Sequence, residues 1–78
     1  MGAFDFGWIV SELLDAGWNE DELVSEEFDG HDYPLYRADP DSCAAVVARR
    51  GDREFRFEFD ASRATWRGML RAAVKVMA

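Results

Sequence analysis

The side chains of this sequence that can act as nucleophiles or proton carriers are few. Cys43 is the only cysteine and His31 the only histidine. A Cys–His nucleophile pair needs both side chains within hydrogen-bond reach, and the strand predicted at Cys43 and the turn predicted at His31 give no reason for them to meet. Two alanines follow Cys43, a setting typical of a small strand residue. The sequence therefore predicts no catalytic residues and a protein that is not an enzyme.

Asp29, His31 and Asp32 form a local group whose atoms suit a divalent cation. One imidazole nitrogen and two carboxylates within four residues are compatible with such a site. No second cluster completes a coordination sphere, and the six glycines are scattered rather than arranged as a phosphate-binding loop. We therefore expect no metal and no cofactor.

Carboxylates give the strongest functional signal. Eight of them lie within eighteen residues: Asp15, Glu20, Asp21, Glu22, Glu26, Glu27, Asp29 and Asp32. Such a concentration of like charge costs stability through self-repulsion. One interpretation is that these groups keep a small protein soluble. The other is that rows of carboxylates imitate a phosphate backbone and bind a basic groove that normally holds nucleic acid.

Acidic and basic residues are distributed unevenly along the chain. The net charge is −7, but residues 1–41 contain twelve acidic side chains and one basic (−11), and residues 42–78 contain four acidic and eight basic (+4). Four of the bases recur at four-residue steps: Arg63, Arg67, Arg71 and Lys75. This ladder could grip phosphates, but the negative net charge favours a solvated helix face that also neutralises acids of the first half. We expect no direct binding of nucleic acid.

Two helices are predicted before residue 29. The first ends near Ala16, ahead of Gly17, which suits the left-handed position that ends helices. Asn19 then caps a second, short helix over residues 20–28, and Glu22 completes a capping box. We expect the four glutamates of this second helix to be exposed.

Three strands are predicted next. Residues 33–38 read as an edge strand, because Pro34 has no N–H to donate to a neighbour. Residues 43–50 and 53–60 form a hairpin with a two-residue turn at Gly51-Asp52. This turn sets the register on both faces: Ala48 opposite Phe55, Val46 opposite Phe57, Ala44 opposite Phe59, Arg49 opposite Glu54, Val47 opposite Arg56 and Ala45 opposite Glu58.

A final helix is predicted from Ser62 to Met77. Its apolar residues fall on one stripe, formed by Trp66, Met69, Leu70, Ala73, Val74 and Met77. The fold class is thus α+β in the order α-α-β-β-β-α, a three-stranded antiparallel sheet with the helices packed on one face. Residues 1–78 are predicted to be a single domain.

Composition also bears on the cellular compartment. A single cysteine suits a reducing environment, and the longest uncharged stretches are far short of the roughly 20 apolar residues that a membrane span needs. We therefore expect a soluble, cytoplasmic protein that does not bind membranes.

In its small size, its acidity and its cluster from Asp15 to Asp32, the chain resembles the small phage-encoded anti-CRISPR proteins. The resemblance implies non-catalytic inhibition in the cytoplasm of a host bacterium. The acidic face would occupy a Lys/Arg-lined groove of a CRISPR–Cas effector complex and block target DNA binding. The basic second half departs from the uniformly acidic surface of a full DNA mimic, which implies partial mimicry through one face.

A different class of protein is also compatible with the sequence. Trp8, Trp18, Tyr33 and Tyr36 exceed what so small a core is expected to hold, and exposed aromatic area is typical of a protein interface or a homodimer contact. This favours a small adaptor or antitoxin-like module that binds its partner through a hydrophobic patch. The sequence leaves open whether the chain is a monomer or a homodimer.

Overall fold

The computed structural model describes residues 3–77 and the side chains of residues 6–77. It contains two α-helices, four strands and three short 3-10 turns (η), in the order α1 (Ala3–Asp15), η1 (Glu20–Glu22), β1 (Leu23–Glu27), β2 (Asp32–Pro34), η2 (Leu35–Arg37), η3 (Pro40–Ser42), β3 (Cys43–Arg50), β4 (Arg53–Glu58) and α2 (Arg63–Met77). The α+β class is confirmed, but the predicted three-stranded sheet is wrong because the sheet has four strands in the order β2-β1-β3-β4.

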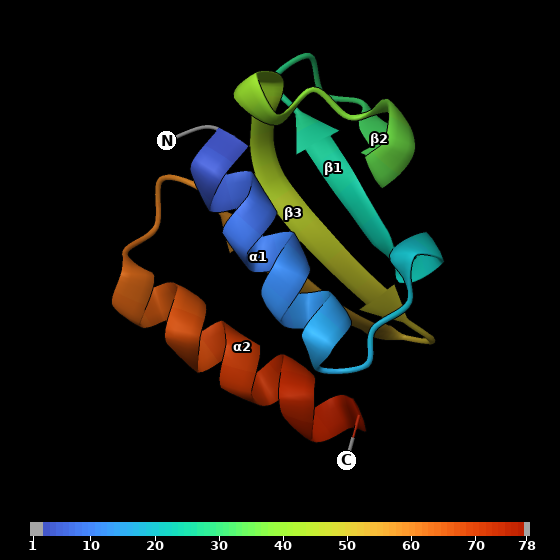
Figure 1. The fold of residues 1–78 in the computed structure, drawn as a ribbon, viewed down its shortest axis with the longest axis vertical. Coiled ribbons are helices and arrows are strands. Elements are labelled where there is room, and N and C mark those ends of the chain that lie inside the picture. The colour runs from blue at the N-terminus through green and yellow to red at the C-terminus, as the bar shows by residue number, and fades with distance from the viewer. Residues whose placement is uncertain (1–2, 78) are drawn as a thin grey trace.

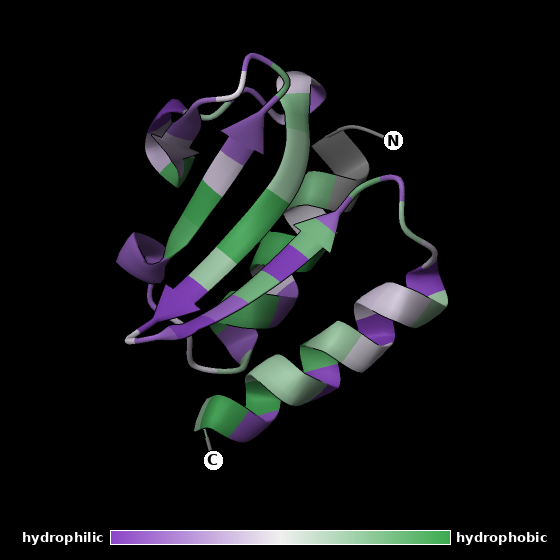
Figure 2. Cartoon of the chain, turned by 180° about the vertical axis from the view of Figure 1, so that it is seen from behind, coloured by the Kyte–Doolittle hydropathy of each residue, from purple (hydrophilic) through white to green (hydrophobic). Residues whose placement is uncertain are grey.

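All neighbouring strands of the sheet are antiparallel, and both helices lie on one of its faces (Figures 1 and 2). The β3–β4 hairpin has the predicted register, with Ala48 opposite Phe55 and Val46 opposite Phe57. Gly51 supports the turn with a φ of +60°, a conformation that glycine adopts without steric cost.

The second predicted helix, over residues 20–28, is absent. The local signal is real, since the backbone N–H of Asn19 donates to the Glu22 carboxylate at 2.9 Å. Only one 3-10 turn follows, however, and the chain then forms β1, in which Leu23 pairs with Ala48 of β3. Pairing with β3 and burial of Leu23 in the core have overridden a local helix signal.

The predicted strand over residues 33–38 is shorter than expected. Strand β2 ends at Pro34, which cannot donate a ladder hydrogen bond, and η2 begins at the next residue. This turn directs Tyr36 to the surface, where it is 80% exposed.

Large apolar side chains from both helices and from the sheet form the core. The indole Nε1 of Trp18 donates to the carbonyl of Ala73 at 3.2 Å and so connects the loop after α1 to α2. The buried stripe of α2 differs from the predicted one at a single position, because Val74 is 46% exposed and Val76 packs against the core instead. Neither helix of the described chain combines the length and the apolar character needed to cross a membrane.

Candidate functional site

The eight carboxylates predicted to bind a partner lie on different elements of the structure. Asp15 ends α1, Glu20, Asp21 and Glu22 form η1, Glu26 and Glu27 lie on β1, Asp29 lies in the turn after β1, and Asp32 begins β2. Their surroundings divide them into three groups: side chains neutralised by arginines, side chains used within the fold, and exposed side chains.

The first group lies partly on the sheet face opposite the helices. Glu26 and Arg56 form a bidentate pair with distances of 2.6 and 2.7 Å, and Arg56 also contacts Glu58 at 3.3 Å. These side chains lie next to Val47 and Ala45, which are 0% and 1% exposed although neither helix covers this face (Figure 2). We infer that the stems of the charged residues shield these two apolar side chains from water. The bond from Arg56 holds the pKa of the Glu26 carboxyl below its usual value.

Two further carboxylates of the predicted set, those of Glu22 and Asp32, are paired with arginine side chains of β3. Arg50 donates to Glu22 at 2.7 and 3.0 Å, and its guanidinium lies 5.5 Å from the centre of the Trp18 ring. The bond from Arg50, together with that from the backbone N–H of Asn19, lowers the pKa of Glu22. Asp32 lies 3.2 Å from Arg49. The arginines of β3 and β4 thus neutralise three of the eight carboxylates.

Glu27 and Asp29 serve the fold itself. Contrary to the expectation of exposure, Glu27 is only 7% exposed, and it accepts hydrogen bonds from the Ser25 hydroxyl at 2.7 Å and from the Asp39 backbone N–H at 3.1 Å. Asp29 accepts from the backbone N–H of His31 and from the hydroxyl of Tyr33, both at 2.9 Å. These bonds lower the pKa of Asp29, and the same carboxylate raises the pKa of Tyr33.

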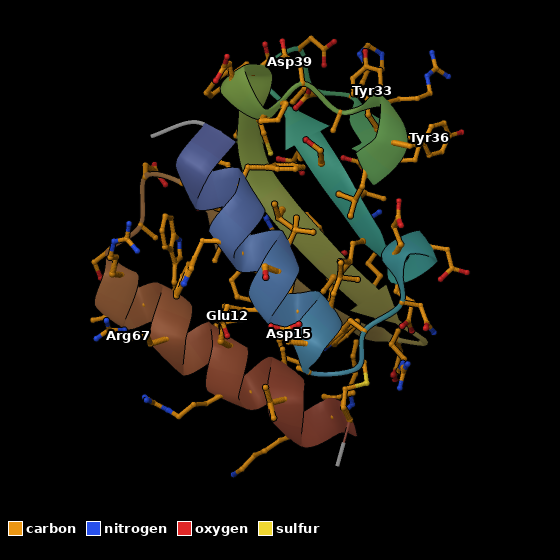
Figure 3. The ribbon with its side chains drawn as sticks, viewed as in Figure 1. Glu12, Asp15, Tyr33, Tyr36, Asp39 and Arg67 are labelled. Atoms are coloured by element: carbon orange, nitrogen blue, oxygen red, sulfur yellow. The ribbon has the colours of Figure 1, made fainter. Side chains whose placement is uncertain are left out.

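Asp15, Glu20 and Asp21 are exposed and make no ion pair with any described side chain. Figure 3 shows Asp15 at the far end of α1, well apart from Tyr36. Glu20 and Asp21, by contrast, line the same hollow as Tyr36. The eight carboxylates therefore do not form one continuous negative face. Of the three exposed members of the set, only Glu20 and Asp21 line a hollow together with an exposed aromatic residue, Tyr36.

The hollow between η1 and η2 has a volume of about 320 Å³. We call it the η1–η2 hollow, and it is lined by Glu20, Asp21, Leu23, Val24, Pro34, Leu35 and Tyr36. Its size is near the lower end of the range for ligand sites, and the residues that line it are mostly apolar, with two acidic residues among them. Tyr36 was anticipated as an exposed aromatic residue, but the apolar wall depends on η2 and on the contact between β1 and β2, which were not predicted.

The other aromatic residues expected at the surface are mostly covered. Trp18 is 2% exposed, and Trp8 and Tyr33 are half-buried. Phe28 is 75% exposed. Its exposure was not predicted, because residues 20–28 were expected to form a helix. Phe28 borders a second hollow, of about 280 Å³, next to Glu26 and Arg56.

Three of the four bases of the ladder on α2 make no ion pair with the described acids of the first half of the chain. The guanidinium of Arg63 lies 5.4 Å from the ring centre of Trp8 and 5.7 Å from that of Trp66. Arg67, Arg71 and Lys75 are exposed and form no ion pair within the described residues, and Figure 3 shows Arg67 pointing away from the body of the protein. Arg67, Arg71 and Lys75 therefore form a solvated helix face.

Cys43 and His31, the two residues considered for nucleophilic chemistry, lie in different surroundings. Cys43 is buried in the core, its thiol donates to the Ala45 carbonyl at 3.1 Å, and burial raises its pKa. His31 lies in the exposed turn, with its Nδ1 atom 3.5 Å from a carboxylate oxygen of Asp29. Over the residues described, no three His, Cys, Asp or Glu side chains are arranged to hold a metal ion.

The ion pairs of Glu22 and Glu26 predict a loss of stability in acid. Because folding lowers their pKa, these pairs stabilise the fold fully above the pKa of 4.5 that the carboxyls have when unperturbed, and this contribution is lost as the pH falls through the lower folded-state pKa. We expect the urea midpoint of unfolding to fall as the pH is lowered below about 5. The double variant Arg50→Gln/Arg56→Gln should show a shallower pH dependence. The control Arg37→Gln, which removes an arginine without an ion pair among the described side chains, should keep the original one; equal slopes for both variants would contradict the assignment.

Comparisons with models of protein families, with curated proteins and with solved structures found no match for this chain.

Proposed function

We propose that this protein is a non-catalytic binding protein that attaches to a positively charged site of a protein partner through the η1–η2 hollow. One observation carries the proposal: Glu20 and Asp21, which make no ion pair with any described side chain, line an apolar hollow together with the exposed Tyr36. Unpaired charge attracts a partner of opposite sign, and apolar and aromatic area supplies affinity once the two surfaces meet.

The more specific form of this proposal is an anti-CRISPR type inhibitor in the cytoplasm of a host bacterium. In this form the carboxylates of η1 occupy positions where a CRISPR–Cas effector complex normally binds phosphates of target DNA, so that binding of the inhibitor excludes DNA. The charge of −11 over residues 1–41 supports attraction to such a groove. Since Glu22, Glu26 and Asp32 are already paired with arginines, the mimicry of DNA is restricted to a small surface.

A second candidate function rests on Phe28. Its ring is 75% exposed beside the hollow that contains Glu26 and Arg56, and exposed aromatic side chains are frequent anchors of protein interfaces. An adaptor or antitoxin-like module would use this surface, and its binding would depend on apolar contact more than on charge.

A charge reversal tests the proposed function. The double variant Glu20→Lys/Asp21→Lys should weaken partner binding about a hundredfold or more, because like charges placed across an interface cost several kcal/mol. The partner is identified by pull-down from a bacterial lysate with mass spectrometry, and affinities are then measured at low and high salt. The native protein should lose affinity as the salt concentration rises.

The matched control is Glu12→Lys/Asp52→Lys, which makes the same change of charge at exposed residues outside both hollows. Equal losses in both double variants would show that net charge, rather than this surface, determines binding. If Phe28→Ser abolishes binding while both charge reversals leave it unchanged, the second candidate replaces the first. Circular dichroism checks that each variant is folded.

A further inference from the structure

The η1–η2 hollow has the chemical character of a receptor for one long cationic side chain. Val24, Pro34 and Leu35 give it apolar walls, and two acidic residues, Glu20 and Asp21, are also among the residues that line it. An anionic ligand would be repelled by these carboxylates, and a purely apolar ligand would leave them without a partner. A side chain with an aliphatic stem and a cationic end satisfies both parts of the hollow.

The same combination of groups occurs elsewhere in this chain with the cation in place. Arg50 pairs with the Glu22 carboxylate through two nitrogens, and its guanidinium lies over the ring of Trp18 at 5.5 Å. Carboxylate, guanidinium and aromatic ring form one unit there, in which the planar guanidinium contacts the other two groups at once.

In the η1–η2 hollow the carboxylates and the aromatic ring are present, but no described arginine joins them. The nearest arginine in the sequence, Arg37, instead lines a separate hollow with Glu27 and Asp39. From this we infer that the η1–η2 hollow binds one arginine side chain of the protein partner, whose guanidinium contacts Glu20 and Asp21 while its flat face lies against Tyr36. The inference rests on the proposed function and specifies what the partner contributes.

Arginine suits this site better than lysine. Its five N–H donors can contact two adjacent carboxylates at the same time, and its planar group stacks on an aromatic ring, whereas an ammonium group is compact and more strongly hydrated. The hollow, at about 320 Å³, has room for a single long side chain.

The experiment is an NMR titration of the ¹⁵N-labelled protein with N-acetyl-arginine methylamide. Expected are chemical-shift changes confined to residues 20–24 and 34–36. The citrulline analogue has nearly the same shape but no charge, and the lysine analogue has the charge but no planar group. Both should bind at least about tenfold more weakly than the arginine analogue. Tyr36→Ala and Glu20→Gln/Asp21→Asn should each reduce arginine binding by a similar factor, whereas Phe28→Ala and Glu12→Gln/Asp60→Asn should leave it unchanged.

Equal binding of the arginine and citrulline analogues, equal binding of the lysine analogue, or shifts centred outside the hollow would each overturn the arginine assignment. These results are separable from a failure of the proposed function. If the arginine analogue binds as expected but Glu20→Lys/Asp21→Lys leaves partner capture intact, the hollow is an arginine site and the proposed route of partner binding is wrong. If charge reversal abolishes capture but the arginine analogue does not bind, the acidic surface is retained and the arginine anchor is rejected.

Discussion

Replacing Phe57 with alanine is expected to lower the free energy of unfolding by about 3–5 kcal/mol. Phe57 is 0% exposed and lies opposite Val46 in the centre of the β3–β4 hairpin. Removing its ring leaves a cavity in a core that has little surplus apolar area, because the chain is short. At roughly 0.05–0.15 kcal/mol per residue, a domain of this length has a total stability of only about 4–12 kcal/mol, so the substitution removes a large share of it.

Urea unfolding followed by circular dichroism measures this loss. The matched control is Phe28→Ala, the same substitution at a residue that is 75% exposed, which should change the stability by less than about 1 kcal/mol. If Phe57→Ala proves unfolded in buffer, Phe57→Leu provides a smaller truncation that should still lose more stability than Phe28→Ala. A loss below about 1 kcal/mol for Phe57→Ala would mean that the register of the hairpin is wrong.

The hairpin was predictable because its information is local. Alternating Phe and charged residues specify a strand with one buried face, and the two-residue turn at Gly51-Asp52 leaves one register in which Ala48 meets Phe55. Both signals lie within eighteen consecutive residues, so no distant part of the chain had to be known. The stripe of α2 was predictable for the same reason, apart from the exchange of Val74 for Val76.

Strand β1 was not predictable in this way. Its first residues follow a capping box, which locally favours a helix, and the competing interaction is pairing with β3, about twenty residues further along the chain. Burial alternates along β1, with Leu23, Ser25 and Glu27 buried. A serine and a glutamate are polar, however, so their positions in the sequence do not indicate a buried face. Residues 23–27 therefore form a strand because of long-range pairing with β3, although the local sequence favoured a helix.

The candidate site shows the consequence of that error. The acidic residues were identified correctly as a cluster in the sequence, yet their neutralisation depends on where β1 lies. Pairing of β1 with β3 places Glu26 opposite Ala45. On the other side of β3, Arg56 of β4 lies opposite Val47, two residues along β3 from Ala45. The net charge of −7 does not reveal which carboxylates are paired within the chain. The position of β1 in the sheet determines which of them remain available to a partner.

Replacing Trp66 with alanine should have an effect of similar size to that of Phe57, about 3–5 kcal/mol, and should weaken the attachment of α2. Trp66 is 3% exposed, and its ring centre lies 5.8 Å from that of Phe59 and 6.1 Å from that of Trp8. Its Nε1 atom also donates to the Glu58 carbonyl at 2.7 Å. One side chain thus joins α2 to α1 and to the end of β4.

Two further substitutions separate the contributions of Trp66. Trp66→Phe keeps most of the apolar contact but removes the hydrogen bond to Glu58, and should cost about 1 kcal/mol beyond the smaller ring area. Val74→Ala, at a residue of the same helix that is 46% exposed, should cost less than about 1 kcal/mol. Hydrogen exchange of the α2 amides is the more specific readout. In Trp66→Ala their protection should fall further than that of β3, because α2 loses contacts with α1 and with the end of β4 while the β3–β4 pairing remains. A uniform loss of protection in α2 and β3 would instead show that helix and sheet unfold as one cooperative unit, with Trp66 contributing to the whole core rather than to the attachment of α2.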